Sequence, residues 1–379
     1  MKEILIAISI DSVGAARLPQ LFAAAGCRVT VVSGAGLAIT ASKYVQDHIV
    51  TERPTESVRA GLEEHLSYFP ARYEQVIIAD EPLLRTFTVR PATPLLARLA
   101  PVTADAEKLA MMLSKVTFSQ TALAAGLPTP EFRVLPAAGD LQRELWGGKP
   151  FVIKTEESLS GSGVHVIRSA GDLEQAKALL QSVPLLIQQY IPGRVGATAV
   201  YFQNGEPKCW FSYYLCRNWP NANSASSAIQ VVWRKDIHPI LQKLGDMTGY
   251  TGLCGLDWVL DPATGKALVL EINPRPTPGL HASHLAQVCF AEAISQSLDG
   301  KALFQPAAKC SSRMYRLFPQ NLFRSIDDRD LREFLRTWQD APWRDPKLLL
   351  SQLRRTITHY LPISLRHRIK VSFRGVSTV

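Results

Sequence analysis

Two apolar segments joined by a short turn constrain the fold of this chain more than any other feature. GLCGLDWVL, residues 252–260, and ALVLEIN, residues 267–273, have the composition of β-strands. The intervening Pro and Gly are typical of a turn. With a five-residue connection, Pro262 to Lys266, Asp257 falls directly across from Glu271. The sequence therefore predicts a β-hairpin that carries two opposed carboxylates.

The second strand of this hairpin ends in polar side chains that share one face. Glu271, Asn273 and Arg275 occupy alternate positions, so an extended backbone points all three the same way. Opposed carboxylates repel one another, and a divalent cation between them removes that cost. Oxygen donors suit Mg²⁺ or Mn²⁺, so we expect Asp257, Glu271 and Asn273 to be metal ligands. The alternative is a solvated face on which Arg275 neutralises Glu271.

A Ser/Gly segment, KTEESLSGSGVHV, follows Lys154 at the end of another apolar strand. Small residues let backbone N–H groups surround phosphate oxygens, and the lysine supplies a positive charge. The spacing differs from G-x-x-x-x-G-K-[ST], which excludes a P-loop NTPase. The alternative interpretation is an ordinary turn. The small residues of this loop are Ser158, Ser160, Gly161, Ser162 and Gly163.

Residues 1–105 alternate between strand and helix patterns. EILIAISI, CRVTVVS and QVIIAD read as buried strands, and Ala15–Ala25 reads as a helix. This alternation predicts a parallel α/β sheet, in which ligands bind at the carboxyl ends of the strands. Asp11 and Asp80 lie at such ends and either bind a ligand or cap a helix. No G-x-G-x-x-G follows the first strand, so a dinucleotide site has little support.

The remaining body of the chain predicts helices mixed with hairpins. The pattern from Asp105 to Ala125 is helical, and FRVLP and KPFVIK follow as a pair of strands. TAVYF and KCWFSYYLC form a hairpin around Asn204-Gly205, a strong turn signal. Arg217–Ser227 reads as a polar loop.

Composition places the chain among globular proteins of two or three domains. It has 379 residues, 46% of them hydrophobic and 20% charged. No stretch approaches the roughly 18 apolar residues of a membrane helix. The apolar run of MKEILIAISIDS is short and fits a first strand better than a signal peptide. Six scattered cysteines without zinc spacing fit a reducing compartment, so we expect a cytoplasmic protein.

The order of these parts resembles the ATP-grasp superfamily. The parts are a helix with Lys115, GLPTP, the FVIK strand, the Ser/Gly loop, QQYIPG and LDWVLDPATGKALVLEINPRP. The chain is most similar to carboxylate–amine ligases and carboxylase-related members, such as amino acid or peptide ligases and carbamoyl-phosphate-synthetase-like enzymes. The resemblance covers about residues 106–298, and the preceding segment is similar to the pre-ATP-grasp domain.

The resemblance implies a fold class that combines α/β and α+β domains. It implies a pre-ATP-grasp parallel α/β domain at 1–105, followed by an ATP-grasp fold of two α+β subdomains. The small lid subdomain would span 106–185 and the large subdomain with the metal site 186–305. A basic C-terminal extension would occupy 306–379.

The resemblance also implies roles for single residues. Lys115 and Lys154 would contact the phosphates of ATP, with Lys154 also catalytic, and the Ser/Gly loop would close over the phosphates as a lid. The three hairpin ligands would hold Mg²⁺, and Arg275 would bind the acyl-phosphate or its oxyanion. Adenine would bind at a hinge formed by Gln188, Gln189, Tyr190 and Ile191.

The chain departs from the family pattern where the ribose is bound. An acidic residue is common shortly after the hinge glycine, whereas this chain has Arg194-Val195. On the acceptor side, Arg217, Asn221 and Ser226 are candidate substrate residues together with Arg275, because a guanidinium binds carboxylates bidentately. The alternative is a surface loop.

Two histidines follow the second strand of the predicted hairpin. His281 and His284 are candidate general bases, although packing and capping are the commoner roles of such residues.

Most of the net charge of +9 lies at the C-terminal end. From Ser311 onward fourteen Arg and Lys residues oppose six Asp and Glu residues, which gives +8. The interpretations are a substrate-side cap, a docking surface for an acidic partner, a membrane-surface segment, or a solvated face on a packed helical appendage. No recognition motif accompanies the charge, so we expect no nucleic-acid partner.

Together these features predict an ATP-dependent enzyme that joins a carboxylate to an amine through an acyl-phosphate. The substrates would be small molecules or peptides, and the protein could form a homodimer. One alternative is an ATP-grasp carboxylase or carboxylate kinase-like enzyme with another nucleophile. The other is a nucleotide sensor without turnover.

Overall fold

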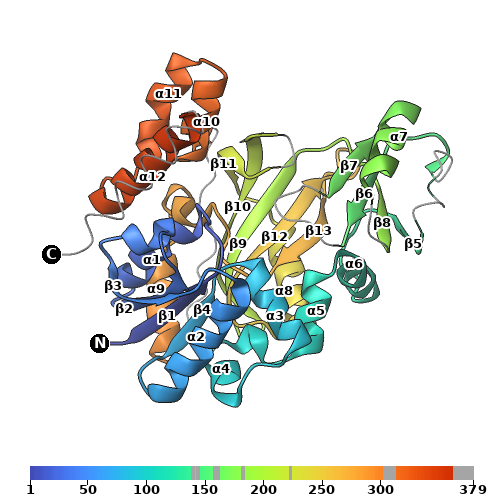
Figure 1. Cartoon of the computed structure of the whole chain (residues 1–379). Helices are drawn as coiled ribbons and strands as arrows, with labels where there is room; N and C mark the ends of the chain where they lie inside the picture. Colours follow the sequence, from blue (N-terminus) through green and yellow to red (C-terminus); the bar gives the residue numbers. More distant parts are fainter. Residues whose placement is uncertain are drawn as a thin grey trace.

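A computed structural model describes residues 1–137, 141, 146–156, 163–180, 184–221, 224–301 and 313–361. Three β-sheets lie side by side, with the N-terminal sheet at one end and a small sheet at the other (Figure 1). The C-terminal helices pack above the N-terminal sheet. None of the described helices is long and apolar enough to cross a membrane.

The first sheet is entirely parallel, in the order β3-β2-β1-β4. This arrangement confirms the predicted parallel α/β sheet, and the strand β3 was not predicted because its residues are mostly half-buried and polar. The strands are β1 (Glu3–Ile8), β2 (Arg28–Gly34), β3 (Val45–Thr51) and β4 (Gln75–Ile78). The helices are η1 (Ala15–Arg17), α1 (Leu18–Ala24), η2 (Ala38–Ala41), α2 (Thr55–Tyr68), α3 (Glu81–Val89), α4 (Pro94–Leu99) and η3 (Pro101–Thr103).

The carboxylates predicted at the strand ends are engaged within the protein. Asp80 is buried and accepts hydrogen bonds from Leu83 N at 2.9 Å and Ser9 Oγ at 2.9 Å. It therefore caps helix α3 and ties it to the end of β1. Asp11 accepts a hydrogen bond from Ala38 N at 3.0 Å and forms an ion pair with Arg355. Asp80 is therefore a helix cap, and Asp11 is engaged by the backbone of η2 and by Arg355.

The second sheet is small and antiparallel, in the order β5-β8-β6-β7. The predicted pairing of FRVLP with KPFVIK is wrong, because β8 lies between these two strands. The segment between them is too long to act as a hairpin turn, so distant residues supply the pairing partner. The strands are β5 (Phe132–Leu135), β6 (Phe151–Thr155), β7 (Val164–Ile167) and β8 (Leu185–Gln189), and α7 (Ala170–Leu179) packs on the sheet.

The single helix predicted from Asp105 to Ala125 is also wrong. Two helices, α5 (Ala106–Leu113) and α6 (Lys115–Ala124), meet at Ser114, whose backbone is extended. The Ser114 hydroxyl accepts a hydrogen bond from Thr117 N at 3.0 Å and caps α6. This break places Lys115 in the first turn of α6, where it faces the end of β6.

The third sheet is antiparallel and contains six strands, in the order β13-β12-β9-β10-β11-β14. The predicted hairpin around Asn204-Gly205 is confirmed, and both residues have positive φ, 51° and 79°. The strands are β9 (Val195–Gln203), β10 (Glu206–Asn218), β11 (Ser226–Val232), β12 (Gly252–Leu260), β13 (Ala267–Asn273) and β14 (Tyr315–Arg316). The accompanying helices are α8 (Ile237–Thr248), η6 (Leu280–Ala286) and α9 (Phe290–Leu298).

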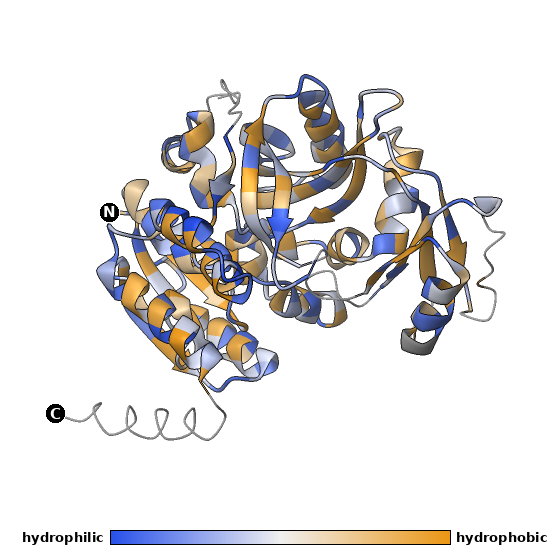
Figure 2. Ribbon diagram, turned by 90° about the horizontal axis from the view of Figure 1, so that it is seen from above, coloured by the Kyte–Doolittle hydropathy of each residue, from blue (hydrophilic) through white to orange (hydrophobic). Residues whose placement is uncertain are grey.

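The main core joins the first and third sheets. One continuous cluster of buried residues includes Ile6, Phe22, Phe211 and Phe290, and the rings of Phe211 and Phe290 meet edge to face. The second sheet has a separate, smaller core with α7. Figure 2 shows apolar residues concentrated along the strands and hydrophilic residues on the outer helix faces. The division at residues 105, 185 and 305 stays a prediction.

The C-terminal helical unit, residues 313–361, is mostly helical. It consists of β14, α10 (Gln320–Asp327), α11 (Leu331–Thr337), η7 (Trp338–Asp340) and α12 (Pro346–Tyr360). Its strand β14 extends the third sheet beside β11, and Leu348 of α12 packs against Ala16 and Ala38. The unit thus contacts both the first and the third sheets.

Candidate active site

The predicted opposition of two carboxylates is confirmed, but by a different route from the one expected. Leu260 pairs with Ala267, so the connection is one residue longer than predicted. Asp261 accepts hydrogen bonds from Ala263 N and Thr264 Oγ1 within this turn. A register shift between Asp257 and Trp258 then restores the pairing of Asp257 with Glu271.

Burial and like charge act together on Asp257. Burial, and then the negative charge of Glu271, raise the pKa of Asp257 to about 7. Asn273 Nδ2 donates a hydrogen bond to Asp257 Oδ2 at 3.2 Å, and Arg275 donates to Asn273 Oδ1 at 3.2 Å. The hairpin therefore presents an acid, an amide and a guanidinium in one connected group.

Lys154 of the second sheet interacts electrostatically with the two carboxylates of the hairpin. It lies near the end of β6 and is 6% exposed. Burial lowers the pKa of Lys154, the positive charge of Lys115 lowers it further, and the carboxylates of Glu271 and Asp257 oppose both effects. Two cations from one side of the site thus face two carboxylates from the other side.

Lys115 is held at this position by the backbone of the second sheet. Its Nζ donates hydrogen bonds to the carbonyl oxygens of Thr155 at 3.1 Å and Glu156 at 3.4 Å. The Glu156 side chain accepts a hydrogen bond from Val116 N at 2.8 Å. Sequence reasoning did not identify Glu156, which fastens the start of α6 to the end of β6.

A backbone hydrogen bond joins the two residues that flank the predicted phosphate loop. Thr155 N donates to Gly163 O at 3.0 Å, so the loop leaves and re-enters the sheet at neighbouring positions. Gly163 is buried. The other predicted loop residues, Ser158, Ser160, Gly161 and Ser162, lie outside the described residues.

The predicted hinge connects the second sheet to the third. Gln188 and Gln189 end β8, Gln188 is buried, and Gln189 N donates to Glu131 O at 2.8 Å. Tyr190 follows and stacks under the guanidinium of Arg168 at 5.2 Å. Ile191 is half-buried in the link to β9. These positions fit a hinge, and adenine binding there stays a prediction.

The departure at Arg194 has a structural explanation. The Arg194 guanidinium lies 3.7 Å above the ring of Tyr214 and donates to Gln230 Oε1 at 2.7 Å. It packs across β10 and β11 and connects these strands to the start of β9.

The predicted substrate residues lie beside the C-terminal helical unit. Arg217 forms an ion pair with Glu333 of α11, with 3.3 Å between Nη1 and Oε2. Ser226 Oγ lies 3.2 Å from Asn218 Oδ1, within the pairing of β10 and β11, and Asn221 is exposed. The strands are longer than expected, so the predicted loop at 217–227 shortens to residues 219–225. Carboxylate binding by Arg217 stays a prediction.

The shortened loop is fastened to the same unit by aromatic packing. Trp219 stacks on Phe323 of α10 with 4.7 Å between ring centroids. Its indole N–H donates to Asp327 Oδ2 at 2.6 Å. The segment that follows β10 is therefore attached to a helix that lies about a hundred residues further along the chain.

His281 has a packing role. Its Nε2 lies 2.9 Å from Asp340 Oδ2, and burial lowers the pKa of His281 although Asp340 opposes that effect. Asp340 also accepts hydrogen bonds from Phe318 N at 2.8 Å and Tyr315 OH at 3.1 Å, and it pairs with Arg17. Asp340 therefore joins the three parts of the chain that meet here.

Tyr213 was not identified from the sequence, although it lies close to the hairpin. Burial and the charge of Asp257 raise the pKa of Tyr213. A side chain at Gly279 would approach the Tyr213 hydroxyl to 2.7 Å. The segment after the hairpin can therefore pass over Tyr213 only because residue 279 is a glycine.

The hairpin carries side chains that could hold a magnesium ion. Asp257, Glu271 and Asn273 offer oxygen donors. Burial, and then the charge of Glu271, raise the pKa of Asp257, and a divalent cation would offset the repulsion between the two carboxylates. Among the residues that the structure describes, no group of three or more His, Cys, Asp or Glu side chains is placed to hold a metal. Two carboxylates and an amide match an ion that keeps water and phosphate oxygens as further ligands.

Comparison with known proteins identifies the domain. The family model of the ATP-grasp domain matches residues 120–289. The chain is 29% identical over 190 residues to an N5-carboxyaminoimidazole ribonucleotide synthase of Synechococcus elongatus. The aligned segment covers 46% of this chain and 45% of that relative. The chain is also 38% identical over 194 residues to a D-alanine–D-alanine ligase of Gloeobacter violaceus. The aligned segment covers 47% of this chain and 63% of that relative.

A solved structure extends the likeness of fold beyond the matched segment. The N5-carboxyaminoimidazole synthetase of Staphylococcus aureus, in complex with ADP, superposes with a TM-score of 0.66 at 15% identity. The superposition covers 86% of this chain and 85% of that chain. Because the family match and the sequence relatives agree, residues 120–289 form an ATP-grasp domain.

Proposed function

We propose that this protein is an ATP- and Mg²⁺-dependent ligase that activates a carboxylate as an acyl-phosphate and joins it to an amine. The observation that carries the proposal is the pairing of Asp257 with Glu271 in the field of Lys154 and Lys115. Such a site neutralises the charge that accumulates when a phosphoryl group is transferred. The substrates would be small molecules or peptides.

The nucleotide would bind between the second and third sheets. Lys154 and Lys115 would contact its phosphates, since both lie at the end of β6 on the side of the hairpin. The Ser/Gly loop would cover the phosphates through its backbone N–H groups. The backbone of residues 188–191 would hold the adenine ring at the hinge.

Asp257, Glu271 and Asn273 would hold the metal ion, Mg²⁺ or Mn²⁺. When bound, the ion would neutralise phosphate charge and orient the terminal phosphoryl group. The hydrogen bond from Asn273 fixes the Asp257 carboxylate in a single orientation before any ligand arrives.

Arg275 would act on the activated carboxylate. Arg275 lies two residues after Asn273, the last residue of β13, and its contact with Asn273 keeps the guanidinium at the edge of the site. A guanidinium there would stabilise the oxyanion that forms when an amine attacks the acyl group. A closed loop would keep water from hydrolysing the acyl-phosphate first.

A carboxylase-type reaction with another nucleophile is the second candidate. It is favoured by the 29% identity to an N5-carboxyaminoimidazole ribonucleotide synthase over nearly half of the chain. The reactive groups proposed above would serve it equally, because both reactions need an activated carboxylate.

A measurement of ADP release separates the candidates. The full chain is mixed with ATP, Mg²⁺ and pooled carboxylic acids, with and without pooled amines, and separately with bicarbonate. ADP release that requires both an acid and an amine supports ligation. Release that requires bicarbonate instead supports carboxylation, and nucleotide binding without release in every mixture would contradict both.

Localisation and oligomeric state belong to the same proposal. We propose that the enzyme acts in the cytoplasm and forms a homodimer. Sedimentation equilibrium tests the dimer, and a monomer at all micromolar concentrations would contradict it.

A further inference from the structure

One face of helix α12 packs firmly against the protein. Leu348, Gln352 and Thr356 are buried at spacings of four, and Leu348 lies in a cluster with Ala16 and Ala38. The helix begins at Asp345, whose carboxylate accepts a hydrogen bond from Leu348 N at 3.2 Å. These contacts fix the rotation of the helix, so its opposite face must point away from the protein.

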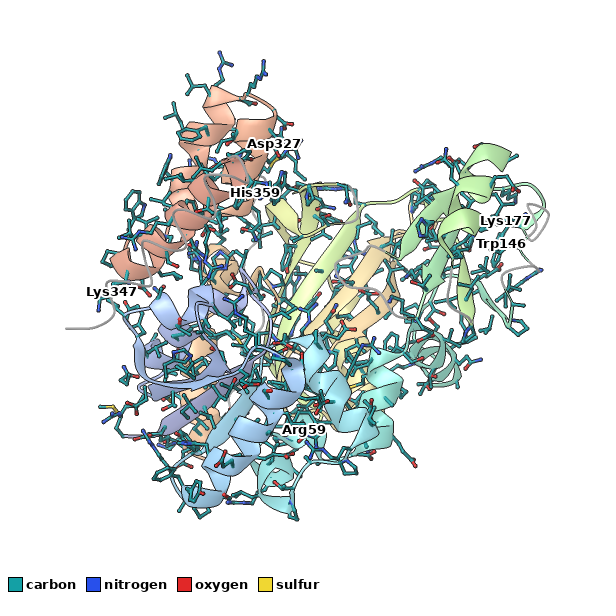
Figure 3. All side chains as sticks on the ribbon, in the orientation of Figure 1. Arg59, Trp146, Lys177, Asp327, Lys347 and His359 are labelled. Atoms are coloured by element: carbon teal, nitrogen blue, oxygen red, sulfur yellow. The ribbon has the colours of Figure 1, made fainter. Side chains whose placement is uncertain are left out.

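The opposite face carries apolar and basic side chains in alternation. Lys347, Leu350, Arg354 and Ile357 follow at spacings of three, four and three, which places them on one side of the helix. All four are exposed, Leu350 to 49% and Ile357 to 61%. Trp343, which precedes the helix, is 62% exposed. We call these five residues the α12 outer face, and Lys347 lies at the outer edge of the molecule in Figure 3.

The sequence around this face has no negative charge. From residue 346 to residue 379 there are seven Lys and Arg residues and no Asp or Glu. The nearest preceding acid, Asp345, is fully buried as the helix cap. Other elements do bring acids to the helix, since Asp11 pairs with Arg355 and Asp327 accepts a hydrogen bond from Tyr360. The α12 outer face itself carries Lys347 and Arg354, so its partner must accommodate two cations beside exposed Trp, Leu and Ile side chains.

The positive charge and the exposed apolar side chains together favour one kind of partner for the α12 outer face over the others. The segment 362–379 contains only basic charges, so it would be repelled by Lys347 and Arg354. A second copy of the same face would place basic residues against basic residues. A nucleic acid would accept the charge and can stack a base on Trp343, but it offers no apolar surface for Leu350 and Ile357. An anionic lipid surface offers phosphates for the cations and an acyl boundary for the apolar residues.

We propose that the α12 outer face binds the protein to anionic phospholipid membranes. The helix would lie parallel to the surface, with Leu350 and Ile357 at the boundary between headgroups and acyl chains. Lys347 and Arg354 would contact lipid phosphates, and Trp343 would lie at the interface, where indole rings are enriched. The proposal is independent of the ligase function, because none of these residues belongs to the active site.

Co-sedimentation with vesicles tests the proposal on the full chain. One set of vesicles contains only phosphatidylcholine, and the other contains about 30% phosphatidylglycerol, which supplies the negative surface charge. We expect binding to the anionic vesicles that weakens as salt rises, and much weaker binding to the neutral ones. Equal binding to both sets, or none to the anionic set, would overturn the proposal.

A variant with a matched control assigns the binding to this face. Leu350→Glu with Ile357→Glu should lower the affinity for anionic vesicles by about tenfold or more, because both lost side chains enter the interface. The control is Tyr68→Glu with Val89→Glu, which places the same charges on two exposed apolar residues of the first domain. The control should bind like the wild type, and ADP release without vesicles should be unchanged in both variants.

Two further outcomes would also overturn the proposal. One is that the Leu350/Ile357 variant binds anionic vesicles as tightly as the control does. The other is that the wild type binds single-stranded RNA or polyglutamate more tightly than the vesicles, since a charged polymer would then be the better occupant.

Discussion

Arg217 of β10 and Glu333 of α11 form an ion pair, with 3.3 Å between the charged atoms, although they are far apart in sequence. Glu333 also pairs with Arg316 at 2.7 Å and Arg336 at 3.2 Å. Trp219, which is two residues after Arg217 in the sequence, stacks on Phe323 of α10. The end of β10 is thus held in place by the C-terminal helical unit.

Replacing Glu333 by Gln should destabilise this junction. The side-chain hydrogen bond from Arg316 and the charges around it hold the pKa of Glu333 at about 2, against an ordinary value of 4.5. A depressed pKa means that the stabilisation is present above about pH 4.5 and is lost as pH falls toward 2. The shift corresponds to about 3 kcal/mol in the free energy of unfolding. Thermal unfolding from pH 7 down to about pH 2 measures how the difference from the wild type shrinks as the carboxylate is protonated.

The control for this substitution is Glu174→Gln, on the exposed surface of α7, where the carboxylate pairs only with Lys177 among the described residues. We expect its Tm to match the wild type. A Tm of Glu333→Gln that also matches the wild type at pH 7 would show that the junction contributes nothing to stability.

Glu271→Gln should abolish turnover without unfolding the protein. The substitution keeps the size of a partly buried side chain but removes one of the two carboxylates expected to hold the metal. ADP release should fall by about a hundredfold or more, while the circular dichroism spectrum stays unchanged. Glu174→Gln serves again as the exposed control, and normal turnover by Glu271→Gln would exclude the metal role.

The stability of the metal-free protein should depend on pH through Asp257. Its pKa in the folded state is about 7, above the ordinary value of 3.8, because of burial and the charge of Glu271. A raised carboxyl pKa stabilises the fold below about pH 4, and that contribution disappears as pH rises through 7. Mg²⁺ should restore Tm at pH 8 in the wild type and much less in Glu271→Gln. An equal response of both proteins to Mg²⁺ would place the ion elsewhere.

Lys154→Met should weaken nucleotide binding and turnover together. The lysine is almost fully buried beside Lys115, so the uncharged and similarly long Met side chain removes the charge with little loss of packing. We expect ADP release to fall by about a hundredfold and the KM for ATP to rise. Lys177→Met, on the exposed face of α7, is the control, and an unchanged KM in Lys154→Met would argue against phosphate contact.

The sequence was sufficient to predict which residues share the hairpin face. The two-residue period of a strand places Glu271 and Asn273 on one face. Arg275 lies beyond the end of the strand, and a turn at Pro274 and a hydrogen bond to Asn273 bring it to the same site. The opposition of Asp257 and Glu271 was also predicted, although through a turn that was one residue too short. A bulge compensated for the longer turn, and no local pattern predicts a bulge in this place.

Only the tertiary structure decided how distant segments meet. The position of β8 between β5 and β6, the contact of Glu156 with the start of α6, and the contacts of Arg217 and Asp340 all involve partners remote in sequence. Backbone periodicity depends on neighbouring residues and is therefore readable in the sequence. Pairing between remote strands and helices depends on which buried surfaces fit together, and that is fixed only when the whole chain packs.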